Sequence, residues 1–323
     1  MLFVPAVHLR EFLESRQTLI YFAAVALAAI LAWLIPGTAA LAPAVDPLLA
    51  LMLFATFLQV PLIELRQALA NVRFLGALLT ANFIAVPALV LVLIPWLPAD
   101  PLLRTGALLV LLAPCIDYVV TFAHLGRADA RSLLASTPLL LAAQMLLLPV
   151  FLGLFLGNAA SGLVQWRPFL HAFVWLIAVP LLLAAACQAW AVRARTGWHA
   201  VRALGLLPVP ATAAVLFVVV ASVMPQLGLA LDAVKTALPA YVAFAVAAPL
   251  LGWAVARGWR LTAEQGRAVA FSSATRNSLV VLPLGLAIPG GMPLIPAVIV
   301  AQTLVELVSE LIYVKLLPRL MKS

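Results

Sequence analysis

Apolar runs of about 20 residues recur along nearly the whole chain, and short stretches rich in basic residues separate them. A helix needs about 20 consecutive apolar residues to cross the hydrocarbon core of a bilayer. We therefore expect an all-α integral membrane protein with ten transmembrane helices. Their predicted centres lie near Leu27, Phe54, Ile84, Ile116, Leu146, Ile177, Val218, Phe244, Leu279 and Leu307.

Two predicted crossings stand out because each combines an ionisable residue near its middle with an internal proline. They are residues 111–129, with Pro114 and Asp117, and residues 271–288, with Arg276 and Pro283. Proline removes a backbone donor and clashes with the preceding turn, so a continuous helix is disfavoured. Broken helices at membrane depth are tolerated where they are buried in protein or line a cavity. The sequence thus predicts two discontinuous helices that meet near the midplane, as in secondary carriers.

A short internal repeat relates the spans that follow the two breaks. The segment PLLLAAQMLLLPVFLGLF aligns with PAVIVAQTLVELVSELIY, so that Gln144 and Gln302 coincide. Five crossings is an odd number, and a second copy would therefore enter the membrane in the opposite sense. We expect two inverted repeats, residues 1–160 with the first five helices and residues 161–323 with the last five.

The composition agrees with a membrane protein. Of 323 residues, 66% are hydrophobic and 9% are charged, whereas soluble domains have about 25% charged residues. The net charge of +8 and the pI near 10.3 could suggest a nucleic-acid partner. The basic residues fall between apolar runs, however, where membrane topology explains them. We expect a lipid bilayer as the partner, and no nucleic acid.

The basic residues also predict the orientation. Of the 19 Lys and Arg residues, Arg104, Arg167 and Lys235 fall on one side of the ten-helix arrangement. Arg276 alone lies within a span, and the other fifteen fall on the opposite side. Because cytoplasmic loops are enriched in Lys and Arg, we expect a multi-pass protein of the cell membrane with both termini in the cytoplasm. The first 17 residues lack a signal-peptide pattern, so the first span is expected to be retained.

Asp117 and Arg276 are the candidate centre of the site, and their opposite charges predict an ion pair. Asp117 either ties helices together or titrates with the transported proton, since acids inside membranes are generally functional. Arg276 stays protonated and either neutralises Asp117 or holds an anionic substrate in its planar fork. A sodium ion beside Arg276 would be repelled, which favours protons as the coupling ion.

Further polar residues at membrane depth complete the candidate site. Cys115 is either a small packing residue or a soft ligand for trivalent arsenic or antimony. Gln302 and Glu306 share one helix face, and Glu306 is a second candidate proton site; Glu310 is expected to be solvated near the cytoplasmic end. The remaining candidates, which bond helices together or line the pathway, are Asn277, Ser278 and Gln144, with Gln59 and Asn82 as further polar positions.

Several classes of function find no support in the sequence. It has no HExxH motif of a zinc protease and no GxxxxGK[ST] motif of an ATPase. The two cysteines form no clustered metal-ligand pattern, and the longest polar stretch is roughly residues 193–204. We expect no cofactor and no metal, and energy from an ion gradient or from the substrate gradient itself. An intramembrane enzyme using Asp117 and Cys115 would need a second acid or a histidine base in the same break, and a channel is a further alternative.

Four segments resemble the bile acid:sodium symporter superfamily and, within it, the arsenite efflux permeases. They are APCIDYVVTFAHLGRAD, FSSATRNSL, LMLFATFLQVPL and ANFIAVP. The resemblance implies a ten-helix inverted repeat with a panel and a core domain, in which the fourth and ninth helices unwind and cross. The positions of the sodium ligands of related carriers correspond here to Val119, Val120, Ser272 and Arg276, so these ligands are largely replaced.

The arsenite carriers of this superfamily use a cysteine on the fourth helix, which corresponds to Cys115. Their acidic residue after the ninth-helix asparagines corresponds to Leu279, and Asp117 or Glu306 could substitute for it. The resulting interpretation is a secondary active transporter, and not an enzyme, that is coupled to protons and exports arsenite or a related oxyanion. The alternative is a proton- or sodium-coupled carrier of small organic anions.

Overall fold

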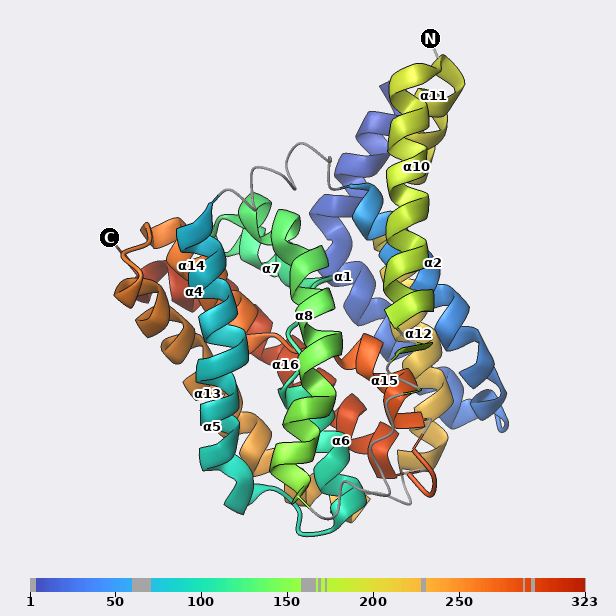
Figure 1. Cartoon of the computed structure of the whole chain (residues 1–323). Coiled ribbons are helices and arrows are strands. Elements are labelled where there is room, and N and C mark those ends of the chain that lie inside the picture. Colours follow the sequence, from blue (N-terminus) through green and yellow to red (C-terminus); the bar gives the residue numbers. More distant parts are fainter. Residues whose placement is uncertain are drawn as a thin grey trace. The chain divides into compact units, whose positions relative to one another are not determined.

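The computed structural model describes residues 4–59, 71–157, 167, 170–171, 173–227, 231–286, 288–291 and 294–322 (Figure 1). Within these residues the chain is helical, and its only extended pairing is one isolated bridge. The chain divides into two compact units, Met1–Ile63 with Ala172–Gly228 and Glu64–His171 with Leu229–Ser323. Each unit contains a segment from each half of the sequence, so the units do not coincide with the halves 1–160 and 161–323, which stay a prediction.

The first unit is built around α12, which packs against α1, η1 and α2, while α10 packs against α2 and α11. Gln188 of α10 donates from Nε2 to the carbonyl oxygens of Phe57 and Leu58, at 3.4 and 3.3 Å, and so covers the end of α2. The elements are α1 (Val4–Leu34), the 3₁₀ helix η1 (Thr38–Ala44), α2 (Val45–Leu58), the π-helix η5 (Phe173–Ala178), α10 (Val179–Arg193), α11 (Arg195–Leu204) and α12 (Pro208–Leu227).

The second unit contains both predicted breaks, with α16 packed against α6, α13 and α15, and α14 packed against α13, α7 and α8. Its elements are α4 (Val72–Thr80), the π-helix η2 (Ala81–Ala85), α5 (Val86–Leu93), the 3₁₀ helix η3 (Ile94–Trp96), α6 (Pro101–Leu111), α7 (Val119–Leu125), α8 (Ala130–Leu156), α13 (Leu231–Gly258), α14 (Ala263–Ala274), α15 (Ser278–Leu286) and α16 (Leu294–Leu320). Figure 1 draws them in teal to green up to α8 and in orange to red from α13 on.

Eight helical stretches in the described part of the chain are long and apolar enough to cross a membrane. They contain eight of the ten predicted centres, and the protein is therefore a multi-pass helical membrane protein. The other two centres, Ile116 and Leu279, lie where the helices were predicted to be broken. Ile116 falls between α6 and α7, and Leu279 lies in the short helix α15. The breaks are confirmed, while the count of ten crossings stays a prediction.

Local signals explain where the broken helices begin. Asp100 caps α6 by accepting from the backbone N–H groups of Leu102 and Leu103, at 2.9 and 3.0 Å, and Pro101 stands at the first helical position, where its missing N–H costs nothing. Thr262 caps α14 in the same way by accepting from the N–H of Gln265. The helices on both sides of the crossover therefore start at capping residues that are readable in the sequence.

Gly106 lets α6 lie close against α16. A methyl group at this position would lie 2.6 Å from Cγ2 of Val298 and 3.2 Å from the backbone of Ile295. We predict that Gly106→Ala lowers the thermal stability of the purified protein, because overpacking costs about 1–3 kcal/mol. The matched control is Gly153→Ala in α8, where no atom lies within 4 Å and the better helix propensity of alanine should slightly stabilise the protein. Equal melting temperatures for the two variants would contradict this packing.

Candidate functional site

The two breaks of the second unit bind one another through their backbones. Pro114 and Arg276 form an antiparallel bridge. The N–H of Cys115 donates to the carbonyl oxygen of Thr275 at 3.0 Å, and the N–H of Asn277 donates to that of Ala113 at 2.8 Å. Unwound backbone at membrane depth must find hydrogen-bond partners inside the protein. Here each break supplies the partners of the other, and the two interrupted helices thereby meet.

The Arg276 side chain is fully buried beside this bridge and is directed at the ends of two helices. Its Nη2 donates to the carbonyl oxygens of Ser272 and Ser273, at 2.5 and 2.6 Å, and to Oδ1 of Asn82 at 2.9 Å. Its Nη1 donates to the carbonyl oxygen of Leu111 at 3.4 Å. The ring of Phe244 lies 5.4 Å from the guanidinium carbon.

These acceptors show how the buried charge is stabilised. Ser272 and Ser273 belong to the last turn of α14, and Leu111 is the last residue of α6. The final carbonyl groups of a helix lack partners within it, and they carry the negative end of the helix dipole. The guanidinium of Arg276 is therefore a cation at the C-terminal ends of both interrupted helices, where cations are favoured.

The predicted ion pair between Asp117 and Arg276 is wrong for this structure. No ion pair within 4.0 Å joins these two described residues, and both carboxyl oxygens of Asp117 lack a hydrogen-bond partner. The backbones of the two breaks do meet, but Arg276 turns its charge to the helix ends. The carbonyl groups at those ends are fixed by the helices themselves, whereas Asp117 lies further along the first break than Pro114, the residue that bridges to Arg276.

Glu306 of α16 is the acid that contacts the second break. Its Oε2 accepts from the backbone N–H of Arg276 and from Nε2 of Gln302, both at 2.7 Å, and its Oε1 accepts from the hydroxyl of Tyr118 at 2.7 Å. The carboxylate thus links α16 to the second break and, through Tyr118, to the first. It also brings a negative charge close to Arg276 without touching its guanidinium.

Two further contacts hold the second break. Asn277 caps α15 by accepting from the N–H of Val280 at 3.2 Å, and its Nδ2 donates to Oε1 of Gln144 in α8 at 3.1 Å. Glu310 accepts a hydrogen bond from the hydroxyl of Thr275 and is fully buried. The prediction that Glu310 is solvated near the cytoplasmic end is therefore wrong, because α16 turns this side chain towards the break.

The structure brings all eight predicted site residues into the buried interior of the second unit. Glu306 joins Arg276 to Gln302, and Asn277 joins Gln144; Cys115 takes part through its backbone. Among the described residues, several buried polar atoms have no hydrogen-bond partner. They are both carboxyl oxygens of Asp117, Nε2 of Gln144, Nε of Arg276, Oγ of Ser278, Oε1 of Gln302 and Oε2 of Glu310 in this unit. Buried polar groups are normally bonded, so this concentration marks the crossover as a candidate binding site.

Sequence reasoning missed one contributor to the site, Tyr118, and did not predict the contacts of another, Asn82. Tyr118 directly follows Asp117, but a tyrosine in an apolar run gives no signal of its own. Asn82 was noted only as a polar residue at membrane depth, yet it accepts from Arg276 and donates to Oγ of Ser272 at 2.9 Å. It lies on the π-helix η2, and π-turns within α-helices are frequent at functional sites. No local sequence pattern predicted that turn.

The fold and the crossover define a helical membrane protein of the secondary-transporter class. The sequence model of the Sodium Bile acid symporter family matches residues 46–233, more than half of the chain. The chain therefore belongs to this family. No curated protein sequence matches the chain.

We predict that Arg276→Gln lowers stability strongly, by about 3 kcal/mol, because several buried carbonyl groups lose their donor. The comparison is Asp117→Asn, which removes a charge from a side chain without a partner and should change stability little. Melting temperatures of the purified variants at equal protein and detergent concentrations measure both effects. An equally large loss of stability in the two variants would contradict the structure and indicate that Asp117 and Arg276 form an ion pair.

Proposed function

We propose that this protein is a proton-coupled secondary transporter that exports arsenite or a related oxyanion across the cell membrane. In this proposal Asp117 carries the proton and Cys115 binds the substrate. The observation that supports it best is the state of Asp117, which is buried at the break with neither carboxyl oxygen bonded. In this proposal the chain crosses the membrane ten times as two inverted repeats, and both termini lie in the cytoplasm.

The contacts of the charged residues support protons as the coupling ion. In broken-helix carriers, half-helix C-terminal ends and unwound carbonyl groups coordinate the coupling cation. Here the guanidinium of Arg276 occupies the ends of α6 and α14. A sodium ion at the same carbonyl oxygens would have to displace this charge or lie against it. Asp117 is free of such contacts, and a carboxyl group without a partner can gain or lose a proton without breaking a hydrogen bond to the protein.

The contacts of Glu306 support a different role for it. Its carboxylate accepts three hydrogen bonds, one from the backbone of Arg276. Protonation would remove an acceptor that the crossover uses. We therefore assign Glu306 to holding the two breaks together, and Asp117 to carrying the proton.

The substrate assignment rests on Cys115, a buried free thiol next to the backbone bridge. A thiol binds trivalent arsenic by replacing one hydroxyl group, which leaves as water, with no change in oxidation state. Soft metalloids prefer such sulfur ligands. The donors that remain near the crossover, Nε2 of Gln144 and Oγ of Ser278, suit the other oxygens of the substrate.

The alternative is a proton- or sodium-coupled carrier of small organic anions, which is equally compatible with membership of the family. It would use Arg276 to hold the anion. Only Nε of its guanidinium is without a partner, since Nη1 and Nη2 already donate to protein oxygens. The two-pronged grip that makes arginine selective for carboxylates is therefore not available unless the crossover rearranges.

We expect everted membrane vesicles to accumulate arsenite when a pH gradient is imposed and to ignore a sodium gradient. Asp117→Asn should abolish the response to the pH gradient and leave exchange of labelled substrate measurable, because only the proton carrier is lost. Uptake is measured for arsenite, antimonite and a series of small organic anions. A variant that keeps full pH-driven uptake would rule out Asp117, and sodium-driven uptake of an organic anion alone would favour the alternative.

The same vesicles test the thiol. Cys115→Ser should reduce arsenite uptake at least tenfold, while Cys187→Ser in α10 of the other unit serves as the matched control and should leave uptake unchanged. Unchanged uptake in Cys115→Ser would remove arsenite from the proposal without affecting the assignment of Asp117.

A further inference from the structure

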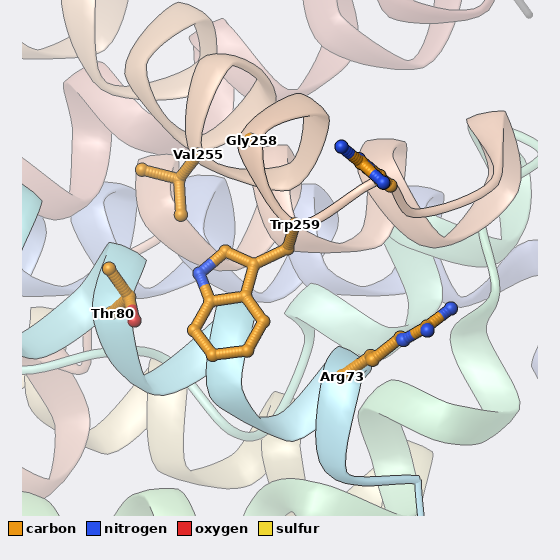
Figure 2. A pocket seen from close by; sticks show the side chains of 6 residues that line it. Arg73, Thr80, Val255, Gly258 and Trp259 are labelled. Carbon is orange, nitrogen blue, oxygen red and sulfur yellow. The ribbon is translucent and has the colours of Figure 1, made fainter.

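A hollow of about 470 Å³ lies between α4 and the end of α13, and none of its lining residues belongs to the crossover (Figure 2). Its lining residues are Arg73, Thr80, Val255, Gly258, Trp259 and Arg260. Figure 2 shows the indole ring of Trp259 beside α4, with Thr80 and Arg73 on either side of it. The ring lies against Gly76, where a methyl group would come within 2.6 Å of it. The absence of a side chain at Gly76 thus lets Trp259 form one wall of the hollow.

The hollow lies at a membrane boundary. One membrane-length stretch begins at Val72 and another ends at Gly258, so Arg73 and Trp259 lie at the same end of neighbouring helices. Tryptophan is enriched at the level of the lipid headgroups. The distribution of basic residues predicts that this end faces the cytoplasm, where the leaflet carries anionic lipids.

The charge of the hollow is positive. Arg73 and Arg260 are both exposed, and no acidic residue is among the lining residues. The hydroxyl of Thr80 adds a hydrogen-bonding group deeper along α4. Two guanidinium groups and a hydroxyl around a hollow of this size suit a phosphate group, which arginine binds through paired N–H donors.

Arg260 holds its place at a conformational cost. Its φ is +56°, a left-handed conformation that glycine adopts readily and other residues rarely do. The end of α13 closes around it through the N–H of Leu261, which donates to the carbonyl oxygen of Ala256 at 3.1 Å. This is the position after a helix end at which glycine is usual. The backbone conformation would favour glycine at this position, so it does not explain the presence of an arginine.

An apolar stripe, formed by the exposed side chains of Ile84 in η2 and Leu91 in α5, follows the hollow along the chain. Thr80 follows Arg73 by seven residues, Ile84 follows Thr80 by four, and Leu91 follows Ile84 by seven. The first spacing, within α4, returns to one side of the α-helix. Ile84 and Leu91 are 66% and 60% exposed. The basic hollow is therefore followed, towards the middle of the membrane, by a surface that suits an acyl chain.

We propose that this hollow binds the phosphate of an anionic phospholipid, with an acyl chain along Ile84 and Leu91. The juxtaposition that carries the proposal is two arginines and an interfacial tryptophan above an exposed apolar stripe. Phosphate is the shared chemistry of a lipid headgroup and a soluble phosphate, and the stripe favours the lipid. The proposal does not depend on which substrate the protein transports.

The test measures the binding of phosphatidylglycerol and phosphatidylcholine to the full-length protein in detergent by native mass spectrometry. The wild type should bind phosphatidylglycerol at least tenfold more tightly than phosphatidylcholine. The double variant Arg73→Gln/Arg260→Gly should lose this preference. Arg260→Gly also removes the strained conformation, so the variant is expected to fold. Arg193→Gln/Arg319→Gln, which removes two exposed arginines outside the hollow, is the matched control and should keep the preference.

Three outcomes would overturn the proposal. They are equal binding of the two lipids by the wild type, an unchanged preference in the double variant, and an equal loss in the control. Inorganic phosphate provides the last arm. If millimolar phosphate displaces phosphatidylglycerol completely, and the Leu91→Ser variant binds the lipid as well as the wild type, the ligand is a soluble phosphate and the lipid assignment fails.

Discussion

The structure of the second unit depends on a buried cation at the carbonyl ends of two interrupted helices. Moving a charge out of water costs several kcal/mol even after relaxation. Arg276 recovers this cost through four hydrogen bonds to oxygens that would otherwise lack donors, three of them carbonyl groups of α6 and α14. The same residue gives its backbone N–H to Glu306. One side chain thus satisfies the helix ends, and its backbone anchors α16.

This arrangement distinguishes residues that are fixed by several hydrogen bonds from residues whose polar side chains have no hydrogen-bond partner. Arg276 and Glu306 are bonded on several sides, and changing the charge of either would break contacts between the two breaks. Asp117 lies in the first break without a bonded partner, two residues after Cys115. A transporter needs both kinds of group, because a site that must bind and release has to stay assembled while its ligands change. The free groups are therefore the ones to which we assign proton and substrate binding.

The sequence was sufficient to predict the breaks but not the partners within them. Pro114 and the polar residues around Arg276 marked both interruptions, and opposite charges suggested that Asp117 and Arg276 pair. The prediction failed because the carbonyl groups at a helix end do not appear in a sequence as charges, although they act as acceptors. Asn82 illustrates the same limit, since its approach to Arg276 depends on a π-turn, and Glu310 was misplaced because helix length alone does not give the direction of a side chain.

The most direct test of the buried cation is the thermal stability of Arg276→Gly in the presence of small cations. Wild-type stability should be the same in sodium chloride and in choline chloride, because the cation is part of the chain. The variant should be much less stable, and millimolar guanidinium should restore part of the loss, since it can occupy the space at the ends of α6 and α14. A wild type that requires sodium for stability, or a variant as stable as the wild type, would contradict the account.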